Sequence, residues 1–143
     1  MRKHYLHKVF EPRSVAVIGA SEREAAVGAQ LLRNLVDSDF EGEIYPVNPK
    51  HQQVQGLPAY ATIRDIDHPV DLAVITVPAE SVPDIVRQCG EREVGAAIVI
   101  SAGFGEVGPR GRNLQNSMVD IARTYNMPLI GPNCLGVIRP SSG

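Results

Sequence analysis

The sequence predicts an α/β fold, a Rossmann-like doubly wound parallel sheet of about five strands in a three-layer αβα arrangement. Three apolar runs, at 15–18, 72–77 and 96–100, are dense in Val and Ile and show no polar alternation, which is typical of strands buried on both faces. Helix-like stretches lie between these runs. Because strand and helix alternate, the strands should be parallel and joined by right-handed crossovers.

The remaining elements follow in chain order. Two weaker strands are expected at 43–47 and 128–130. Helices are expected at 27–36, 79–89 and 114–125, because their apolar residues recur at three- and four-residue spacings on one face. Those faces are Val27, Leu31, Leu32 and Leu35 in the first helix; Val82, Ile85, Val86 and Cys89 in the second; Leu114, Met118, Ile121, Ala122 and Tyr125 in the third.

The domain organisation is expected to be simple. With 143 residues, the chain is predicted to be a single domain, residues 1–143, with a core of about 10–140 and a linker or end at 141–143. Residues 49–60 form a long connection of the kind that often carries function. The end, 139–143, has no structural signal, so we expect the natural chain to continue.

Composition and charge argue against several classes of protein. A net charge of −2 gives no electrostatic reason to expect a nucleic-acid partner. No apolar run approaches the roughly 20 residues that span a bilayer, and no signal peptide is visible. Cys89 and Cys134 have no metal-binding spacing, so both are predicted to be free thiols of a cytoplasmic protein. Cys134 has no neighbouring His in the sequence and is interpreted as a structural thiol. All four histidines are interpreted as surface or loop residues.

The turn after the first strand carries the strongest chemical signal. Gly19, Ala20 and Ser21 precede a helix, and small residues at that place let the backbone and the helix N-terminus approach a phosphate. Ser21 would add a hydroxyl donor or a helix cap, and Gly28 would permit close helix packing. The turn lacks the Gly-x-Gly-x-x-Gly of NAD-binding domains and the Gly-Lys-Ser/Thr of P-loops. The alternative is that Gly19 only closes a βα turn.

The end of the second strand favours a phosphate over free ribose hydroxyls. NAD-binding domains usually place an acid there, whereas the nearest charged residue here is Lys50. A lysine suits a phosphorylated ribose, which both NADP and coenzyme A carry. The alternative is a solvated loop lysine.

Two further loops follow predicted strands at the edge where open α/β sheets bind ligands. Each taken alone could be an ordinary tight connection, but they converge on one edge. The two loops contain Val77, Pro78 and Ala79 after the third strand, and Ser101, Ala102 and Gly103 after the fourth.

Taken as a set, these motifs resemble those of the CoA-binding domain family. That domain begins the NDP-forming acyl-CoA synthetases and the related succinyl-CoA synthetase α-subunit, and it occurs in bacterial protein lysine acetyltransferases. The resemblance extends from about Phe10 to Pro140. It rests on the segments 10–21 (FEPRSVAVIGAS), 45–50 (YPVNPK), 77–79 (VPA), 101–104 (SAGF) and 131–136 (GPNCLG).

The resemblance implies that coenzyme A or an acyl-CoA is bound at the carboxyl edge of the sheet. It implies roles for four groups of residues and a loop-shaping role for Asn133. Gly19, Ala20 and Ser21 would hold phosphate, with Gly28 in the same turn; Lys50 would meet a CoA phosphate; Val77, Pro78 and Ala79 would flank the adenosine or pantetheine part; Ser101, Ala102 and Gly103 would line the path to the thiol.

Catalysis would then depend on parts outside this chain. In the synthetases of this family a phosphohistidine in the next domain relays the phosphoryl group, and an ATP-grasp domain or partner subunit is needed as well. This chain shows no catalytic group of its own. The leading interpretation is a fragment of an acetate–CoA ligase. The alternatives are a regulatory module of a lysine acetyltransferase, a stand-alone CoA- or nucleotide-binding protein, and, less favoured, an NADP-binding oxidoreductase domain.

Overall fold

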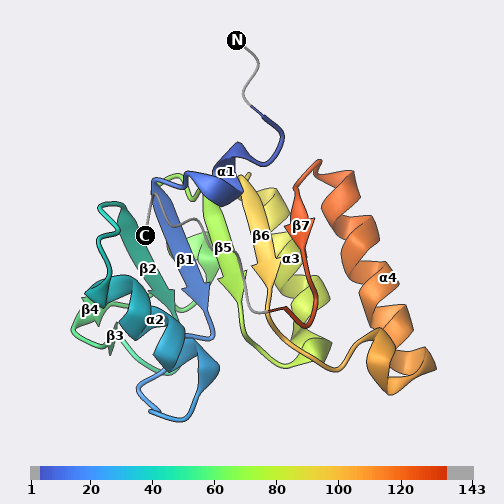
Figure 1. The fold of residues 1–143 in the computed structure, drawn as a ribbon, viewed down its shortest axis with the longest axis horizontal. Coiled ribbons are helices and arrows are strands. Elements are labelled where there is room, and N and C mark those ends of the chain that lie inside the picture. Colours follow the sequence, from blue (N-terminus) through green and yellow to red (C-terminus); the bar gives the residue numbers. More distant parts are fainter. Residues whose placement is uncertain (1–3, 135–143) are drawn as a thin grey trace.

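A five-stranded parallel sheet forms the centre of the molecule in the computed structural model, which describes residues 4–134 (Figure 1). The spatial order β2-β1-β5-β6-β7 corresponds to 2-1-3-4-5 in chain order, a common doubly wound order. The predicted fold class is therefore confirmed. The strand order reverses between β1 and β5. The strands are β1 (Ser14–Ile18), β2 (Glu43–Val47), β5 (Leu72–Ile75), β6 (Ala96–Val99) and β7 (Leu129–Ile130).

Helices cover both faces of the sheet. α2 (Val27–Asp37) packs on one face, while α3 (Val82–Glu91) and α4 (Pro109–Thr124) pack on the other. A short helix, α1 (His7–Phe10), lies at the edge where the strands begin (Figure 1). This arrangement is the predicted three-layer sandwich, and it leaves the carboxyl edge of the sheet to the loops.

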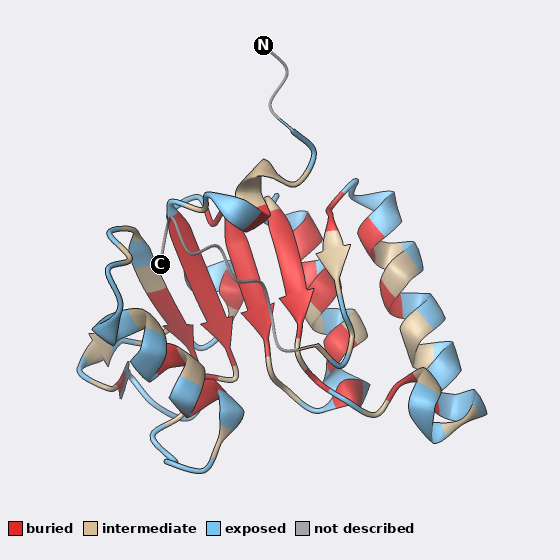
Figure 2. Cartoon of the chain, viewed as in Figure 1, coloured by how far each residue is buried: buried red, intermediate tan, exposed pale blue. Residues whose placement is uncertain are grey.

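The central strands are buried on both faces, which explains their unbroken apolar sequences (Figure 2). Every residue of β1, β5 and β6 is buried. Alternate residues enter two separate cores: Ala16 and Ile18 pack towards α3 and α4, and Val15 and Val17 pack towards α2. Each fully buried Val or Ile side chain contributes about 1.5–3 kcal/mol, so both faces stabilise the sheet.

Two helices differ from the prediction in detail. α4 begins at Pro109, five residues before the expected start at Leu114. The sequence analysis missed this start because the first turn is polar and carries no apolar periodicity. In α2 the prediction that Val27 faces the core is wrong, since that side chain is 54% exposed. The buried face instead begins with Gly28 and Ala29, whose small size lets the helix lie close to the sheet.

The connection at 49–60 contains a β-hairpin that the sequence analysis missed. Strands β3 (Gln53–Val54) and β4 (Leu57–Pro58) are antiparallel and are joined by Gln55 and Gly56, which have φ values of 50° and 78°. Two central residues with positive φ are typical of type I′ hairpin turns. A short 3-10 helix, η1 (Ile63–Asp65), follows, with Thr62 and Asp65 forming a capping box. The connection between β2 and β5, all of it described, thus contains no α-helix.

Some sequence expectations fall outside the described residues. The end at 139–143 and the last two residues of the 131–136 motif are among them. The assignment of 1–143 to one domain stays a prediction. Within residues 4–134, no helix has the length and apolar character needed to cross a bilayer.

Candidate functional site

A cleft of about 600 Å³ opens at the carboxyl edge of the sheet, at the point where the strand order reverses. Open α/β sheets usually bind their ligands at this place. The loops after β1, β2 and β5 and one face of α3 form its walls. Six of the eleven predicted site residues line it: Gly19, Ala20, Ser21, Lys50, Val77 and Pro78.

Two glycines allow the turn after β1 to form. Gly19 has a φ of +97°, and a Cβ built there would lie 2.3 Å from Thr76 Oγ1. A Cβ on Gly28 would lie 2.0 Å from the carbonyl oxygen of Gly19. Gly28 does not line the cleft, and its role is the close packing of α2 against this turn. Thr76 Oγ1 in turn donates to the Ile18 carbonyl at 3.0 Å, joining the ends of β1 and β5.

The N-terminus of α2 faces the same region without a side-chain cap. Its N-cap residue is Ala26, which lines the cleft, and the described first turn holds no acidic residue. The alternative that Ser21 caps this helix is wrong, because the helix begins six residues later and Ser21 Oγ accepts from the Arg23 N–H at 3.0 Å. Unpaired N–H groups at a helix start favour an anion.

Two amide side chains missed by the sequence analysis connect the turn to its surroundings. Asn48 Nδ2 donates to the Ala20 carbonyl at 2.8 Å, and Asn48 Oδ1 accepts from the Lys50 N–H at 2.7 Å. Gln55, at the hairpin turn, donates through Nε2 to the Ala29 carbonyl at 2.9 Å and to the Ser21 carbonyl at 3.3 Å. The Asn-Pro dipeptide at 48–49 is a turn signal that could have drawn attention to Asn48.

The polar wall of the cleft is predominantly basic. Arg23, Lys50 and His51 line it, against one acid, Glu22. The Glu22 carboxylate accepts from the backbone N–H of Gln55 at 2.5 Å. Charged and N–H donor groups of this kind favour phosphate. The sequence analysis identified Lys50 but interpreted His51 as a loop residue and did not single out Arg23.

Another part of the lining is apolar. Ile18, Val47, Val77, Pro78 and Ile85 contribute to it. A cleft with one apolar wall and one basic wall suits a ligand that combines a flat ring with phosphate groups.

The other predicted residues lie next to this cleft but do not line it. Ala79 is buried. Ser101 Oγ donates to the Val77 carbonyl at 2.5 Å, which holds the loops after β5 and β6 side by side. The Gly103 N–H donates to Glu106 Oε1 at 2.5 Å, and backbone hydrogen bonds of this kind hold the pKa of the Glu106 carboxyl below its usual range. Ala102 is exposed in the same loop.

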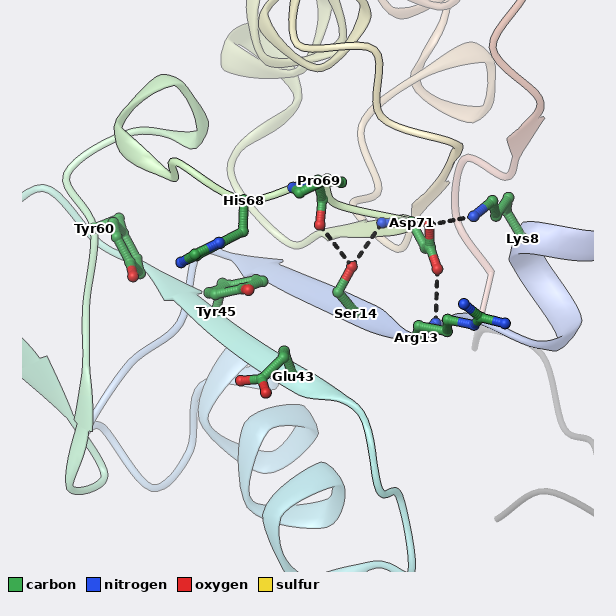
Figure 3. Close-up of a pocket in the computed structure, with 9 residues that line it drawn as sticks. All are labelled: Lys8, Arg13, Ser14, Glu43, Tyr45, Tyr60, His68, Pro69 and Asp71. Carbon is green, nitrogen blue, oxygen red and sulfur yellow. Dashed lines mark hydrogen bonds and ion pairs between the residues drawn. The ribbon is translucent and has the colours of Figure 1, made fainter.

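A second cavity, of about 650 Å³, lies at the amino edge of the sheet (Figure 3). At its centre Asp71 accepts from Lys8 Nζ at 2.5 Å and from the Arg13 N–H at 2.8 Å, and Ser14 Oγ accepts from the Asp71 N–H at 2.9 Å. Burial raises the pKa of the Asp71 carboxyl, but the hydrogen bonds from Lys8 and Arg13 outweigh that effect and hold it below its usual value. These groups satisfy one another, so we interpret this cluster as a structural link between the N-terminal segment and β5.

An aromatic group forms the other side of the second cavity. The Tyr45 ring meets Tyr60 edge to face at 5.8 Å and stacks on His68 at 6.3 Å. Burial, followed by the nearby Glu43 carboxylate, raises the pKa of Tyr45. These ring contacts therefore pack β2 against the connection between β2 and β5.

Neither cysteine is placed as a nucleophile. Burial raises the pKa of the Cys89 thiol to about 12, and Cys134 Sγ donates to the Val99 carbonyl at 3.3 Å. Both are free thiols. Among residues 4–134 no group of three or more His, Cys, Asp or Glu side chains could hold a metal ion.

A parallel sheet with a glycine-lined, basic cleft at its reversal point defines the doubly wound class of nucleotide-binding domains. Comparison with known proteins narrows this class. The family model described as "CoA binding domain" matches residues 13–140, and the chain belongs to this family. The suspected resemblance is thereby confirmed.

Relatives of known function agree with this assignment. The chain is 46% identical, over 94% of its length, to the ADP-forming acetate–CoA ligase I of Archaeoglobus fulgidus. It is 40% identical, over 93% of its length, to the α-subunit of the ADP-forming acetate–CoA ligase I of Pyrococcus furiosus. It covers 19% and 30% of those proteins, respectively, and so spans less than a third of either.

Solved structures support the fold as well. The structure of the dinucleotide-forming acetyl-coenzyme A synthetase 1 of Ca. Korarchaeum cryptofilum, in complex with phosphate and ADP, superposes with a TM-score of 0.91 at 38% identity. The match covers 96% of this chain and 29% of that one.

Proposed function

We propose that this chain binds coenzyme A or acyl-CoA and supplies the CoA-binding part of an ADP-forming acyl-CoA ligase of the acetate–CoA type. The observation that carries the proposal is the cleft: a glycine turn, three basic side chains and an apolar wall meet in a chain that belongs to the CoA-binding domain family. The identity of 46% and 40% to two ADP-forming acetate–CoA ligases supports a ligase of this kind.

In this proposal the phosphates of CoA lie at the turn of Gly19, Ala20 and Ser21. The backbone N–H groups of Ala20 and Ser21, with the uncapped start of α2, would donate hydrogen bonds to the diphosphate. Lys50 would meet the 3′-phosphate that distinguishes CoA from dephospho-CoA. The base would lie against the apolar wall at Val77 and Pro78.

The pantetheine arm would leave the cleft past the loop after β6. Ser101, Ala102 and Gly103 line that path in the proposal, and the hydrogen bond from Ser101 to Val77 fixes the loop beside the cleft. Forming the thioester requires the thiol to meet an activated acyl group. That chemistry is assigned to segments outside this chain or to a partner subunit of the ATP-grasp type, and the chain's own residues bind and orient CoA.

The test is calorimetric titration of the chain with CoA, acetyl-CoA, dephospho-CoA, NAD and NADP. Saturable binding of CoA and acetyl-CoA without binding of either dinucleotide is expected. NADP and CoA both carry a phosphorylated ribose. Binding of NADP without binding of CoA would therefore assign the cleft to a dinucleotide and refute the proposal. Absence of CoA binding by a folded chain would also refute it.

A further inference from the structure

The cleft extends along α3, away from the glycine turn. Ser81, the N-cap residue of α3, lines it together with Ile85 and Gln88, and their spacings of four and three residues place them on one side of the helix. Seven residues correspond to about 10 Å along a helix axis. The lining of the cleft therefore continues along α3 as far as Ile85 and Gln88.

Gln88 presents an unusual polar group at this inner region. Its side chain is buried, with the residue 7% exposed. Its Nε2 donates to Asp84 Oδ2 at 2.8 Å. A carboxylate only accepts hydrogen bonds, so the amide nitrogen must face Asp84 and the amide oxygen must be the remaining polar atom. That oxygen, Oε1, is shielded from solvent and has no hydrogen-bond partner within the described part of the chain.

An unpaired buried acceptor favours a ligand that brings a donor. The neighbouring wall of Val77, Pro78 and Ile85 is apolar and suits a flat ring. Adenine combines such a ring with an exocyclic amino group on its edge. Hypoxanthine and guanine carry a carbonyl oxygen at that position, which would oppose Oε1 with a second acceptor.

We infer that Gln88 is a specificity-determining residue that accepts a hydrogen bond from the amino group of the adenine base of the bound nucleotide, with Asp84 holding its side chain in the accepting orientation. This inference rests on the proposed function, since it assigns the base of the proposed ligand. A base with a carbonyl oxygen at that position would lose this hydrogen bond and place a second acceptor against Oε1. The affinity for such a nucleotide should be lower by about tenfold or more.

The experiment uses two small probes that differ only at that position of the base, adenosine 3′,5′-bisphosphate and inosine 3′,5′-bisphosphate, together with CoA. Calorimetric titration of the wild-type chain should show about tenfold tighter binding of the adenosine compound. Gln88→Met keeps the length of the side chain and removes the carbonyl, so it should bind both bisphosphates equally and CoA about tenfold more weakly. Gln30→Met, an equivalent change at an exposed position of α2 away from the cleft, should retain the wild-type preference.

The outcomes separate the inference from the proposed function. Equal affinity of the wild-type chain for the two bisphosphates, with CoA still bound, would overturn the role of Gln88 alone and would indicate that a water satisfies Oε1. A preference that persists in Gln88→Met would overturn it too, as would a Gln88→Met that loses stability and leaves selectivity unchanged. Failure of the wild-type chain to bind CoA would overturn the proposed function and this inference together.

Discussion

Replacing Gly28 by Ala tests how closely α2 must approach the turn after β1. The added Cβ would lie 2.0 Å from the Gly19 carbonyl oxygen, 2.8 Å from its carbonyl carbon and 3.0 Å from Thr76 Oγ1. An ordinary carbon–oxygen contact needs about 3.2–3.5 Å, so the helix or the turn must move by more than about 1 Å. Backbone atoms cannot rotate away as a side chain would.

The expected cost follows from two opposing effects. Overpacking of this kind destabilises by about 1–3 kcal/mol, while exchanging Gly for Ala inside a helix recovers up to about 1 kcal/mol. We expect a net loss of about 1–2 kcal/mol in the free energy of unfolding, which lowers the Tm by roughly 2–8 °C for a domain of this size. Because the turn itself is displaced, affinity for CoA should fall about tenfold or more.

Urea unfolding and calorimetric titration would measure the two effects in the same sample. Asn34→Ala is the control, because it improves helix propensity at an exposed position of α2 and adds no contact with the turn. It should leave CoA affinity unchanged. A Gly28→Ala variant with wild-type stability and wild-type affinity would refute the argument that this contact sets the geometry of the turn.

Three further changes test separate parts of the structure. In calorimetric titration, Lys50→Ala should lower the affinity for CoA about fivefold and leave the affinity for dephospho-CoA unchanged. The control Arg33→Ala makes the same charge change at an exposed position of α2 and should change neither affinity. Equal losses for both ligands would contradict a contact between Lys50 and the 3′-phosphate. Asp71→Asn should lower the free energy of unfolding by about 1 kcal/mol at pH 7. The folded-state pKa of Asp71 is depressed, so its contribution to the free energy of unfolding is present above the ordinary pKa of 3.8 and is lost as the pH falls through the folded-state pKa. The difference in stability between variant and wild type should therefore disappear in acid. A difference independent of pH would contradict this. Cys89, with a pKa of about 12, should resist a thiol-specific reagent at pH 8, where roughly one thiol in 10⁴ is ionised, and should react after unfolding; rapid labelling of Cys89 in the folded chain would show that its burial is wrong.

The sheet could be predicted from the sequence because its central strands are buried on both faces. That burial produces uninterrupted apolar runs, and three of them match β1, β5 and β6. The hairpin at 53–58 could not be predicted in the same way, since each of its strands has two residues and only Val54 is fully buried. The start of α4 was missed because a polar first turn carries no periodicity.

The sequence located residues of the cleft whose place depends on the local backbone, and it missed those whose place depends on tertiary contacts. Gly19 and Lys50 follow strands directly, so their place at the sheet edge is fixed by position along the chain. Asn48 and Gln55 make hydrogen bonds to residues up to 34 positions away. Gln88 differs, because its Oε1 is buried without a partner among the described residues. Only the folded arrangement brings Asn48 and Gln88 to the cleft and Gln55 against the turn after β1.

The hairpin between β2 and β5 has a consequence for the thermodynamics of binding. Its Gln55 side chain fixes the carbonyls of Ser21 and Ala29, so the loop that would receive phosphate is already ordered before any ligand arrives. A preordered receptor loses little conformational entropy on association, and affinity is correspondingly higher for the same contacts. The connection between β2 and β5, which contains no α-helix, thus acts at a distance from the ligand by reducing the conformational freedom of the empty site.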